Sequence, residues 1–561
     1  MPPRLYPEPG YAPEVPSRFT RSRFLGGLAP LLAGIVAAPG TALAARRYAP
    51  RLDRIRVGNG GRPYAGDRRL FATVSPGVAN RDTAVVEFDL VDAAGVRLDV
   101  IRTARERRQV VATVEQHLAA GPQQLTWAPD LTTPVGSYLL RLTVLADGRA
   151  PRVYGGPRPL TAAGSRCPVV RVLGVEAACD RRSYAPGDLI RLSVFSDAYR
   201  LTLGVIQSGP EPQYSQKVDQ ISGIPVGKLV TFPWRKNRDA PATIRVRAGV
   251  DWQTGVYAVK LTKANGVDGF APFVLRPAEL GASRQAVVIP TNTWQAYNFY
   301  DADGDGYGDT WYAGGNPPVV LTRPYRDRGV PPRFHQLDAP FLHWLAMTEK
   351  TPDFICDDDL ETFPSGDVLR ELYDLVVFHG HTEYESAHVY DVVSRFRDLG
   401  GRLIFLSADA FYWKVTPSSK PAALHRTQPW RKLGKPEAAL LGAQYRGNDN
   451  GSRRGVFQVR NASAVPWLFE GTDVVDGSTV GDATGGYGIE IDATTKESPP
   501  ETIVIAEIPD VFGPGFTAQM TYYETAAGAK VFNAGAMNFC GSVLFEPMNR
   551  MLLNLWSHMT S

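Results

Sequence analysis

A six-residue segment, 379–384, carries side chains that could bind a metal ion or move protons. His379, His381 and Glu383 alternate along it, so in an extended conformation their side chains would share one face. Such a trio could bind zinc or another divalent metal, or one imidazole could act as a general base. A third interpretation is that these side chains hydrogen-bond neighbouring loops and fix the walls of a pocket. We take His379, His381 and Glu383 as the candidate catalytic residues.

Two further loops rich in aromatic and polar residues, 291–298 and 407–413, each follow a short apolar run, as segment 379–384 does. Binding sites in open parallel sheets form where the carboxyl ends of the strands open into loops. If the three strands are neighbours, the three loops converge on one pocket. The residues expected to line it are Trp294, Asn298, Asp409 and Trp413.

Segment 301–309 has the spacing of a calcium-binding loop. Carboxylates stand at its first, third, fifth and ninth positions, with glycine at the sixth, as at the start of an EF-hand loop. The twelfth position is Tyr312, where an EF-hand has a glutamate, and the alternative is a solvated acidic turn. The expected calcium ligands, which would brace the loop after Tyr297, are Asp301, Asp303, Asp305 and Asp309.

A second acidic run, Asp357-Asp358-Asp359, follows another predicted strand. We interpret it as a solvated loop that begins a helix. A magnesium site is the less favoured alternative.

The apolar runs that precede these loops predict a parallel sheet. Residues 386–399 carry apolar side chains at helical spacing and end at Gly400-Gly401, which is typical of a helix C-terminus. A strand, a helix and a strand with such short links form a βαβ unit. The expected strands are 286–290, 373–378, 402–406 and 530–532, and a last helix is expected at 547–556.

The preceding part of the chain shows short alternating apolar and polar runs separated by turn signals, which predicts β-sandwiches. Examples are the runs 84–90, 138–144 and 189–194. The predicted fold is therefore multidomain: two N-terminal immunoglobulin-like β-sandwich modules, 45–162 and 163–280, and a C-terminal α/β domain, 281–561.

Residues 1–44 have the features of a Sec- or Tat-like signal peptide, which predicts export to the cell surface or the extracellular space. Several arginines precede the apolar stretch 24–38, and Ala42-Leu43-Ala44 offers a cleavage site. In an oxidising compartment Cys167 and Cys179 could form a disulfide, whereas Cys356 and Cys540 are expected in the core.

The balance of 61 Lys and Arg against 57 Asp and Glu, without a basic stripe, argues against a nucleic-acid partner. The leader is also too short and too rich in glycine and proline for a transmembrane span. The expected partner is a small-molecule substrate or ligand. Polysaccharide binding by the sandwich modules is a further hypothesis, tested by retention on sugar columns.

Several motifs resemble one known family. The run YDLVVFHGHTEYESAHVYDVVSRFRDLGGRLIFLSADAFYW, with WQAYN, DAPFLHWL and FICDDDL before it and VFNAGAMNFCGS after it, resembles the C-terminal domain of the N,N-dimethylformamidase large (beta) subunit family. The resemblance covers roughly residue 284 to the C-terminus. It implies an architecture similar to class I glutamine amidotransferases, and a second subunit or a homo-oligomer. Glu383 and Tyr384 stand where an amidotransferase has its cysteine, so thiol catalysis is not expected.

The resemblance also implies a mononuclear iron, held by two tyrosines and a glutamate, that hydrolyses a small amide. Tyr384 is the tyrosine carried over from the family motif. Phe354 stands where relatives often have a tyrosine, so Tyr297 or Tyr412 is expected to supply the second phenol oxygen. Glu383 or Glu524 would supply the carboxylate.

The predicted function is metal-assisted hydrolysis of a C–N bond in a small linear amide. The alternative is a non-catalytic exported ligand-binding or cell-surface protein that keeps the fold with an incomplete metal site.

Overall fold

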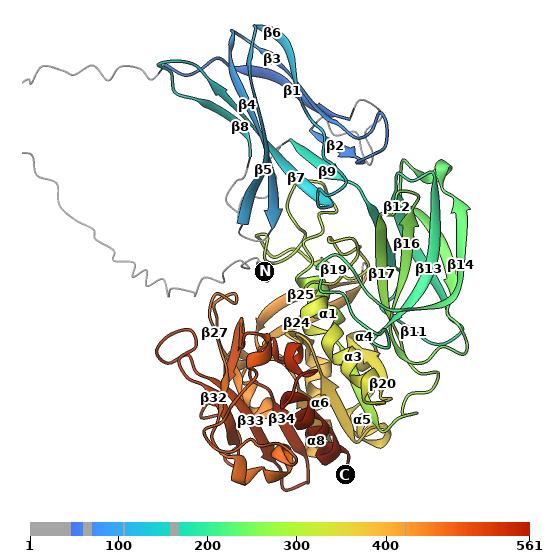
Figure 1. Cartoon of the computed structure of the whole chain (residues 1–561), viewed down its shortest axis with the longest axis vertical. Coiled ribbons are helices and arrows are strands. Elements are labelled where there is room, and N and C mark those ends of the chain that lie inside the picture. The colour runs from blue at the N-terminus through green and yellow to red at the C-terminus, as the bar shows by residue number, and fades with distance from the viewer. Residues whose placement is uncertain (1–46, 60–69, 105–106, 157–167, 421) are drawn as a thin grey trace, which may run out of the picture.

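The computed structural model describes residues 47–59, 70–104, 107–156, 168–420 and 422–561 (Figure 1). The expected signal segment, 1–44, and Cys167 of the expected disulfide lie outside these residues. The chain is rich in β-structure and is divided into several packed sheets. No helix in the described part of the chain is both long enough and apolar enough to cross a membrane.

The first β-sandwich packs a three-stranded sheet against a larger one, and the core between them contains Phe88 from one sheet and Leu98 from the other. The smaller sheet has the order β1 (Leu52–Gly58), β3 (Ala84–Leu90) and β6 (Gly121–Trp127). The larger has the order β2 (Phe71–Val74), β9 (Val169–Val172), β7 (Gly136–Leu145), β4 (Ala94–Ala104) and β5 (Arg107–Leu118), with β8 (Arg152–Gly155) paired to β7.

Strand β9 shows where sequence reasoning and structure differ on this domain. The sequence places the end of the first module at residue 162, but β9 pairs with both β2 and β7 inside its larger sheet. The first sandwich therefore continues to Val172. The short apolar run of β9 looks the same in sequence whichever module it completes.

The second β-sandwich has the same two-layer arrangement around a core of its own. One sheet has the order β10 (Val175–Cys179), β12 (Leu189–Ser196) and β15 (Ala242–Arg247). The other has the order β11 (Ser183–Tyr184), β17 (Asp268–Leu275), β16 (Gly255–Lys263), β13 (Arg200–Ser208) and β14 (Ile224–Pro233). Cys179 is buried in this core, with its sulfur 3.8 Å from the carbonyl oxygen of Ala271.

The third domain contains a nine-stranded sheet in which the five strands at one end run parallel and the rest antiparallel. Its order is β20 (Asp353–Cys356), β18 (Gln285–Ile289), β21 (Leu375–Phe378), β23 (Arg402–Phe405), β34 (Lys530–Asn533), β33 (Ala518–Glu524), β32 (Ile503–Ile508), β28 (Phe457–Val459) and β29 (Thr479–Val480). The predicted strands before the three aromatic loops are thus direct neighbours, β18, β21 and β23.

Helices cover both faces of this sheet, because its central strands are apolar on both sides. Val288 and Phe405 pack toward α5 (Gly366–Leu372) and α6 (Ala387–Asp398), whereas Val287 and Ile404 pack toward α3 (Ala339–Met347) and α8 (Met548–Thr560). The Ser386 hydroxyl caps α6 by accepting a hydrogen bond from the Val389 N–H at 3.1 Å. The predicted βαβ unit is confirmed, and Cys356 and Cys540 are fully buried, as expected.

Smaller elements complete the domain around the carboxyl ends of the parallel strands (Figure 1). A four-stranded sheet has the order β19 (Val319–Val320), β25 (Ala422–Pro429), β24 (Trp413–Ser419) and β22 (Tyr384–Ser386). Two ribbons pair β26 (Gln444–Asn448) with β31 (Glu490–Ala493) and β27 (Arg454–Gly455) with β30 (Tyr487–Gly488). The short α-helices are α1 (Thr291–Ala296), α2 (Phe334–Leu337), α4 (Asp357–Leu360) and α7 (Ala438–Leu441).

Candidate functional site

The loop after β21 turns sharply at Gly380, which has a φ of +65°. His379 therefore points to the core, where its Nδ1 lies 3.7 Å from Asp338 Oδ1 and its ring packs against Phe341. Burial lowers the pKa of His379 to about 3, so the imidazole is neutral. The expectation that His379 shares one face with His381 and Glu383 is not met, because the turn interrupts the extended conformation that it requires.

Beyond the turn, two tyrosine hydroxyls converge on the carboxylate of Glu383. Tyr297 donates a hydrogen bond of 2.6 Å to Oε2, and Tyr312 donates one of 3.3 Å to Oε1. The Tyr384 hydroxyl is hydrogen-bonded to that of Tyr312. The rings of Tyr297 and Tyr312 stack with their centroids 4.4 Å apart. We call Tyr297, Tyr312, Glu383 and Tyr384 the tyrosine–glutamate cluster.

Helix α1 holds this cluster together from the neighbouring strand. It begins directly after β18, and the Thr293 hydroxyl accepts a hydrogen bond of 3.0 Å from the Glu383 N–H. The Asn292 side-chain amide donates one of 3.2 Å to the carbonyl oxygen of Tyr384. At the other end of the helix, the N–H of Tyr297 bonds to the carbonyl oxygen of Thr293 at 3.1 Å. One short helix thus fixes the backbone of two loops that carry the cluster.

His381 lies between the cluster and further buried acids. Its Nε2 is 3.3 Å from Glu383 Oε2, 3.1 Å from Glu490 Oε2 and 3.8 Å from Asp409 Oδ2. Asn448 donates a hydrogen bond of 2.6 Å to Glu490 Oε1, which turns Oε2 toward the imidazole. Nitrogen and oxygen atoms of His381, Asp409 and Glu490 lie within 4.8 Å of one another, close enough to bind a cation.

Burial dominates the electrostatics of these acids. It raises the pKa of Glu383 to about 7, while His381 and the hydroxyls of Tyr297 and Tyr384 act in the opposite direction. Burial, followed by the charges of Glu383, Glu490 and Asp492, raises the pKa of Asp409 well above its ordinary value. Asp492 itself accepts a hydrogen bond of 2.8 Å from the Asp409 N–H. So many carboxyl groups in one buried site favour bound protons or a bound cation.

Tyr412 lies close to the tyrosine–glutamate cluster but has no hydrogen bond to it among the described residues. Burial, and then the charges of Asp409 and Glu383, raise its pKa. Its ring packs against Trp413 and Tyr445, and the Arg431 guanidinium lies 4.9 Å from its centroid. Tyr312, which the sequence did not place in the site, occupies the position that was expected for Tyr412. Its sequence signal is its place three residues after the acidic loop, next to Trp311.

Two of the expected pocket residues have structural roles instead. Trp294 packs edge-on against Tyr325 and Phe334 in the core on the α3 side. The side-chain amide of Asn298 donates a hydrogen bond of 2.8 Å to the carbonyl oxygen of Pro324. Both lie on the α1 loop, but their side chains face the supporting structure.

The other two expected pocket residues, Asp409 and Trp413, lie near the cluster. Asp409 faces His381, and Trp413 lies under the Arg426 guanidinium, 4.5 Å from its ring centroid. The same guanidinium lies 5.9 Å from the Tyr312 ring. These side chains form an aromatic and cationic rim beside the buried acids.

The alternative carboxylate, Glu524, lies elsewhere in the domain. It accepts a hydrogen bond from the Tyr522 hydroxyl and lies 3.9 Å from His558 of α8.

Glu490 is the acid that sequence reasoning missed. Its signal is an acid–apolar–acid alternation, Glu490 to Asp492, within an otherwise apolar strand.

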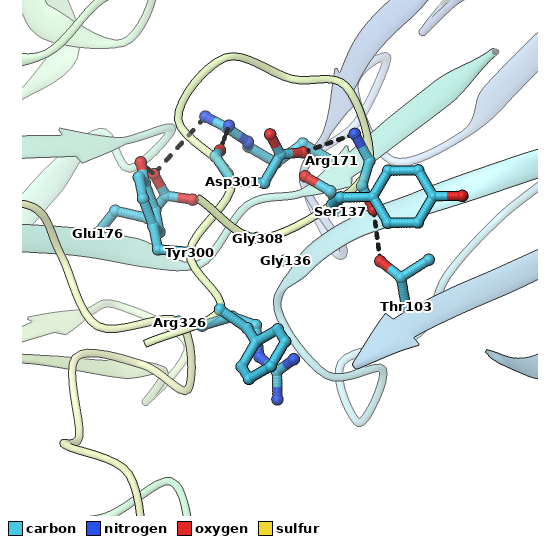
Figure 2. A pocket seen from close by; sticks show the side chains of 12 residues that line it. Thr103, Gly136, Ser137, Arg171, Glu176, Tyr300, Asp301, Gly308 and Arg326 are labelled. Atoms are coloured by element: carbon cyan, nitrogen blue, oxygen red, sulfur yellow. Dashed lines mark hydrogen bonds and ion pairs between the residues drawn. The ribbon is translucent and has the colours of Figure 1, made fainter. Parts of the chain in front are cut away.

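The acidic loop 301–309 lies against both β-sandwiches (Figure 2). Carboxylate oxygens of Asp301, Asp303 and Asp305 lie within 4.8 Å of one another. The loop also touches other domains: Arg171 of β9 bonds to the carbonyl oxygen of Asp301, and the Tyr300 hydroxyl donates to Glu176 of β10 at 2.6 Å. The residues that make these contacts line a small pocket between the domains.

Asp309 closes the acidic loop through backbone contacts. Its Oδ2 accepts a hydrogen bond of 2.7 Å from the Ala302 N–H. Arg323 donates one of 2.5 Å to the carbonyl oxygen of Asp309 and one of 2.7 Å to that of Gln295. The loop is therefore tied through Arg323 to α1, and Tyr297 directly follows this helix.

The acidic run 357–359 is not a solvated loop. Asp357 and Asp359 are buried, and Asp358 is paired with Arg182 of the second sandwich at 2.8 Å. Asp359 accepts a hydrogen bond of 2.9 Å from the Cys356 N–H, as expected for the start of a helix. The burial was not foreseeable, because the covering arginine comes from another domain.

All residues of the tyrosine–glutamate cluster, together with His381 and Glu490, fall within residues 228–550, which match the family model "N,N-dimethylformamidase beta subunit-like, C-terminal". Two curated relatives are the N,N-dimethylformamidase beta subunits of Paracoccus aminophilus, 24% identical over 309 residues, and of Alcaligenes sp., 25% identical over 309 residues. In each case the match covers 44% of this chain and 39% of the relative, so less than half of the relative's length is matched.

One similar solved structure is the native conformation of E. coli alpha-2-macroglobulin, with a TM-score of 0.22 and 10% identity. The match covers 41% of this chain and 16% of the macroglobulin chain. A TM-score this low does not establish a common fold. The family match, in contrast, extends over more than half of the 561 residues. The chain belongs to the N,N-dimethylformamidase beta subunit-like, C-terminal family.

Proposed function

We propose that the protein hydrolyses the C–N bond of a small linear amide with the help of an iron ion. One observation carries the proposal: two tyrosine hydroxyls, from Tyr297 and Tyr312, meet the two oxygens of one buried carboxylate, Glu383. The names of the curated relatives, N,N-dimethylformamidase beta subunits, favour the same substrate class. At the level of fold, we propose an architecture similar to class I glutamine amidotransferases without the thiol nucleophile.

The donor set fits a ferric ion. Phenol and carboxylate oxygens are hard ligands, and two segments bring them together: Tyr297 and Tyr312 from the loop between α1 and β19, and the buried Glu383 from the loop before β22. Tyr384 stands beside them, bonded to Tyr312. When bound, the ion would act as a Lewis acid that polarises the amide carbonyl and lowers the pKa of water.

The chain's own residues supply the proton transfers. Glu490 Oε2 lies 3.1 Å from His381 Nε2. The side-chain amide of Asn448 holds Glu490 in this orientation by donating a hydrogen bond to its other oxygen. In the proposed reaction a water oxygen bonds to the amide carbon, and its proton passes to the His381–Glu490 pair. The pair then returns the proton to the departing nitrogen as the C–N bond breaks, which gives a carboxylic acid and an amine. General acid–base catalysis of this kind contributes about a hundredfold to ten-thousandfold.

The surroundings of the site favour a small substrate. Glu383, Glu490 and Asp409 are almost fully buried. The rings of Trp311 and Tyr384 lie 4.9 Å apart beside them. An enclosed site of this kind excludes bulk water and strengthens electrostatic interactions with the reacting groups.

The rival function, a ligand-binding protein without catalysis, makes a different prediction for the purified protein. If the full chain is purified without chelators, stoichiometric iron and hydrolysis of formamides, measured as released amine, support the hydrolase. An intact fold without iron and without hydrolysis, even after iron is added back, supports the rival.

We also propose that Asp301, Asp303 and Asp305 bind calcium, with Asp309 closing the loop. The proximity of three carboxylates supports this, since calcium prefers several oxygen ligands. Burial raises the pKa of Asp301 to about 7, which a bound cation would oppose. The role of the ion would be to stiffen the segment that joins Tyr297 to Tyr312.

Export and assembly are further proposals. The arginines and the apolar stretch of residues 1–44 support export, and fractionation of cells that express the tagged chain would test it. The names of the relatives, which are beta subunits, support assembly with a second subunit or with further copies of the chain. Light scattering of the purified chain would distinguish an oligomer from a monomer.

A further inference from the structure

The second β-sandwich reaches into the α/β domain through one buried arginine. Arg182 lies between β10 and β11 and is 8% exposed. Its Nε donates a hydrogen bond of 2.8 Å to Asp358 Oδ2, and its Nη1 donates one of 2.6 Å to Asn292 Oδ1. A buried guanidinium is unfavourable unless it is paired, and both of these partners belong to the other domain.

Asn292 carries this contact into α1 and onward to the site. Its side-chain nitrogen donates to the carbonyl oxygen of Tyr384 at 3.2 Å, while its oxygen accepts from Arg182. Its own N–H bonds to Asp357 Oδ2 at 2.8 Å. The Thr291 hydroxyl donates to the same oxygen at 2.6 Å. The first turn of α1 is therefore fixed between Arg182, Asp357 and the loop that carries Tyr384.

The charges around this contact depend on the same arginine. Asp357 is almost fully buried, and Glu385, next to Tyr384, is fully buried. The Arg182 guanidinium lies 4.0 Å from Asp357 Oδ2 and pairs with Asp358. Without the guanidinium, the carboxylate of Asp357 would be buried beside the first turn of α1 without this paired cation.

We propose that Arg182, from the second sandwich, is a positioning residue of the amide-hydrolysis site. It acts through Asn292 to set the separation between α1, which Tyr297 directly follows, and the loop that carries Glu383 and Tyr384. The proposal rests on the proposed function for its kinetic consequence. Its structural consequence can be measured in any case.

The experiment compares two variants of the full chain, Arg182→Met and Arg276→Met. Arg276 is a matched control because it also comes from the second sandwich and lies 3.6 Å from Asp359, in the same acidic helix, α4. Among the described residues its guanidinium contacts Asp359 and the carbonyl oxygen of Pro277, not Asn292. Hydrogen–deuterium exchange of the peptides around residues 291–297 and 380–386 is measured, together with kcat and KM for amide hydrolysis.

For Arg182→Met we expect faster exchange in both peptides and a kcat lower by about ten- to a hundredfold, since small misplacements cost this much. KM should change less than kcat, and Arg182→Lys should restore part of the loss. Arg276→Met should leave both peptides and kcat near those of the wild type. If both arginine variants behave alike, the interface only docks the domains and the proposal is overturned.

The experiment also gives a result if the wild type is inactive or if Arg182→Met does not fold. If the wild type hydrolyses no amide, the proposed function fails, and the exchange data alone then support or overturn the positioning role. If Arg182→Met does not fold, the double variant Arg182→Met/Asp358→Asn replaces it, because it also removes the carboxylate that the arginine pairs with. Unchanged exchange at residues 291–297 and 380–386 in the double variant would overturn the proposal.

Discussion

The hydroxyl of Tyr297 donates a hydrogen bond of 2.6 Å to the carboxylate of Glu383, a residue 86 positions further along the chain. Tyr312 reaches the other oxygen of the same carboxylate. Both tyrosines lie in the segment between α1 and β19, whereas Glu383 directly precedes β22. The cluster is open to single substitutions.

Tyr312→Phe removes one of the two hydroxyls that meet Glu383. We expect loss of bound iron and a fall in kcat/KM of about a hundredfold or more, since a metal ligand supplies several kcal/mol. The matched control is Tyr390→Phe, whose ring packs against Trp430 in the core on the α6 side. Elemental analysis and steady-state kinetics check this. Equal iron content in both variants would contradict the assignment of Tyr312.

Glu490→Gln keeps the shape of the side chain but removes its charge beside His381. We expect kcat to fall about a hundredfold to ten-thousandfold while iron remains bound, because the loss concerns proton transfer. Glu524→Gln is the control, since Glu524 lies near His558 of α8. If kcat of Glu490→Gln stays within a few-fold of the wild type, Glu490 is not the proton acceptor.

Gly380→Ala tests the turn that separates His379 from His381. The added Cβ would lie 2.8 Å from Asp338 Oδ1, at a φ of +65°. Gly434 has a φ of +75° with nothing within 4 Å, so Gly434→Ala measures the conformational cost alone, about 1–2 kcal/mol. We expect a larger loss of unfolding free energy for Gly380→Ala, together with lower activity. Equal losses in urea denaturation would mean that the clash is relieved.

Asp374 predicts an acid-dependent loss of stability. Hydrogen bonds from Arg284 and then Arg370 lower the pKa of Asp374 from 3.8 to about 2. Because the folded-state pKa lies below the unfolded value, this stabilisation is complete above about pH 4 and is lost as the pH falls to about 2. Asp374→Asn should therefore be less stable than the wild type at pH 7, with a difference that shrinks in this window. A difference independent of pH in urea denaturation would contradict it.

Asp305→Asn tests the calcium proposal. We expect calcium to raise the Tm of the wild type and the chelator EGTA to lower it, since an ion bound only by the folded state stabilises it. The variant should respond weakly to both. Differential scanning calorimetry with and without EGTA checks this. An identical response in wild type and variant would show that the stabilising ion, if any, binds elsewhere.

The sequence was sufficient to predict the scaffold of the site. The continuous apolar runs of β18, β21 and β23 can be recognised because these strands are covered on both faces. Helix α6 shows a regular apolar spacing between Ser386 and Gly400, each of which marks an end of the helix. These signals are local, so no knowledge of distant contacts is needed to read them.

The side chains around the scaffold were harder to predict. Trp294 and Asn298 lie in an aromatic loop at the correct strand end, but a helical turn directs one into the core and the other to a carbonyl oxygen. Glu490 is brought to His381 by the pairing of β26 with β31, a long-range contact that no local pattern announces. Which side of a loop faces the site depends on such contacts.

The buried arginine of the second sandwich also determines how the molecule can be divided for experiments. The family match begins at residue 228, in the middle of strand β14, whereas Arg182 and the β13 partner of that strand come earlier. A fragment cut at the edge of the match would lose half of a hairpin and the guanidinium that faces Asn292. The smallest fragment worth expressing therefore starts near Gly174, between β9 and β10, and keeps the second sandwich whole.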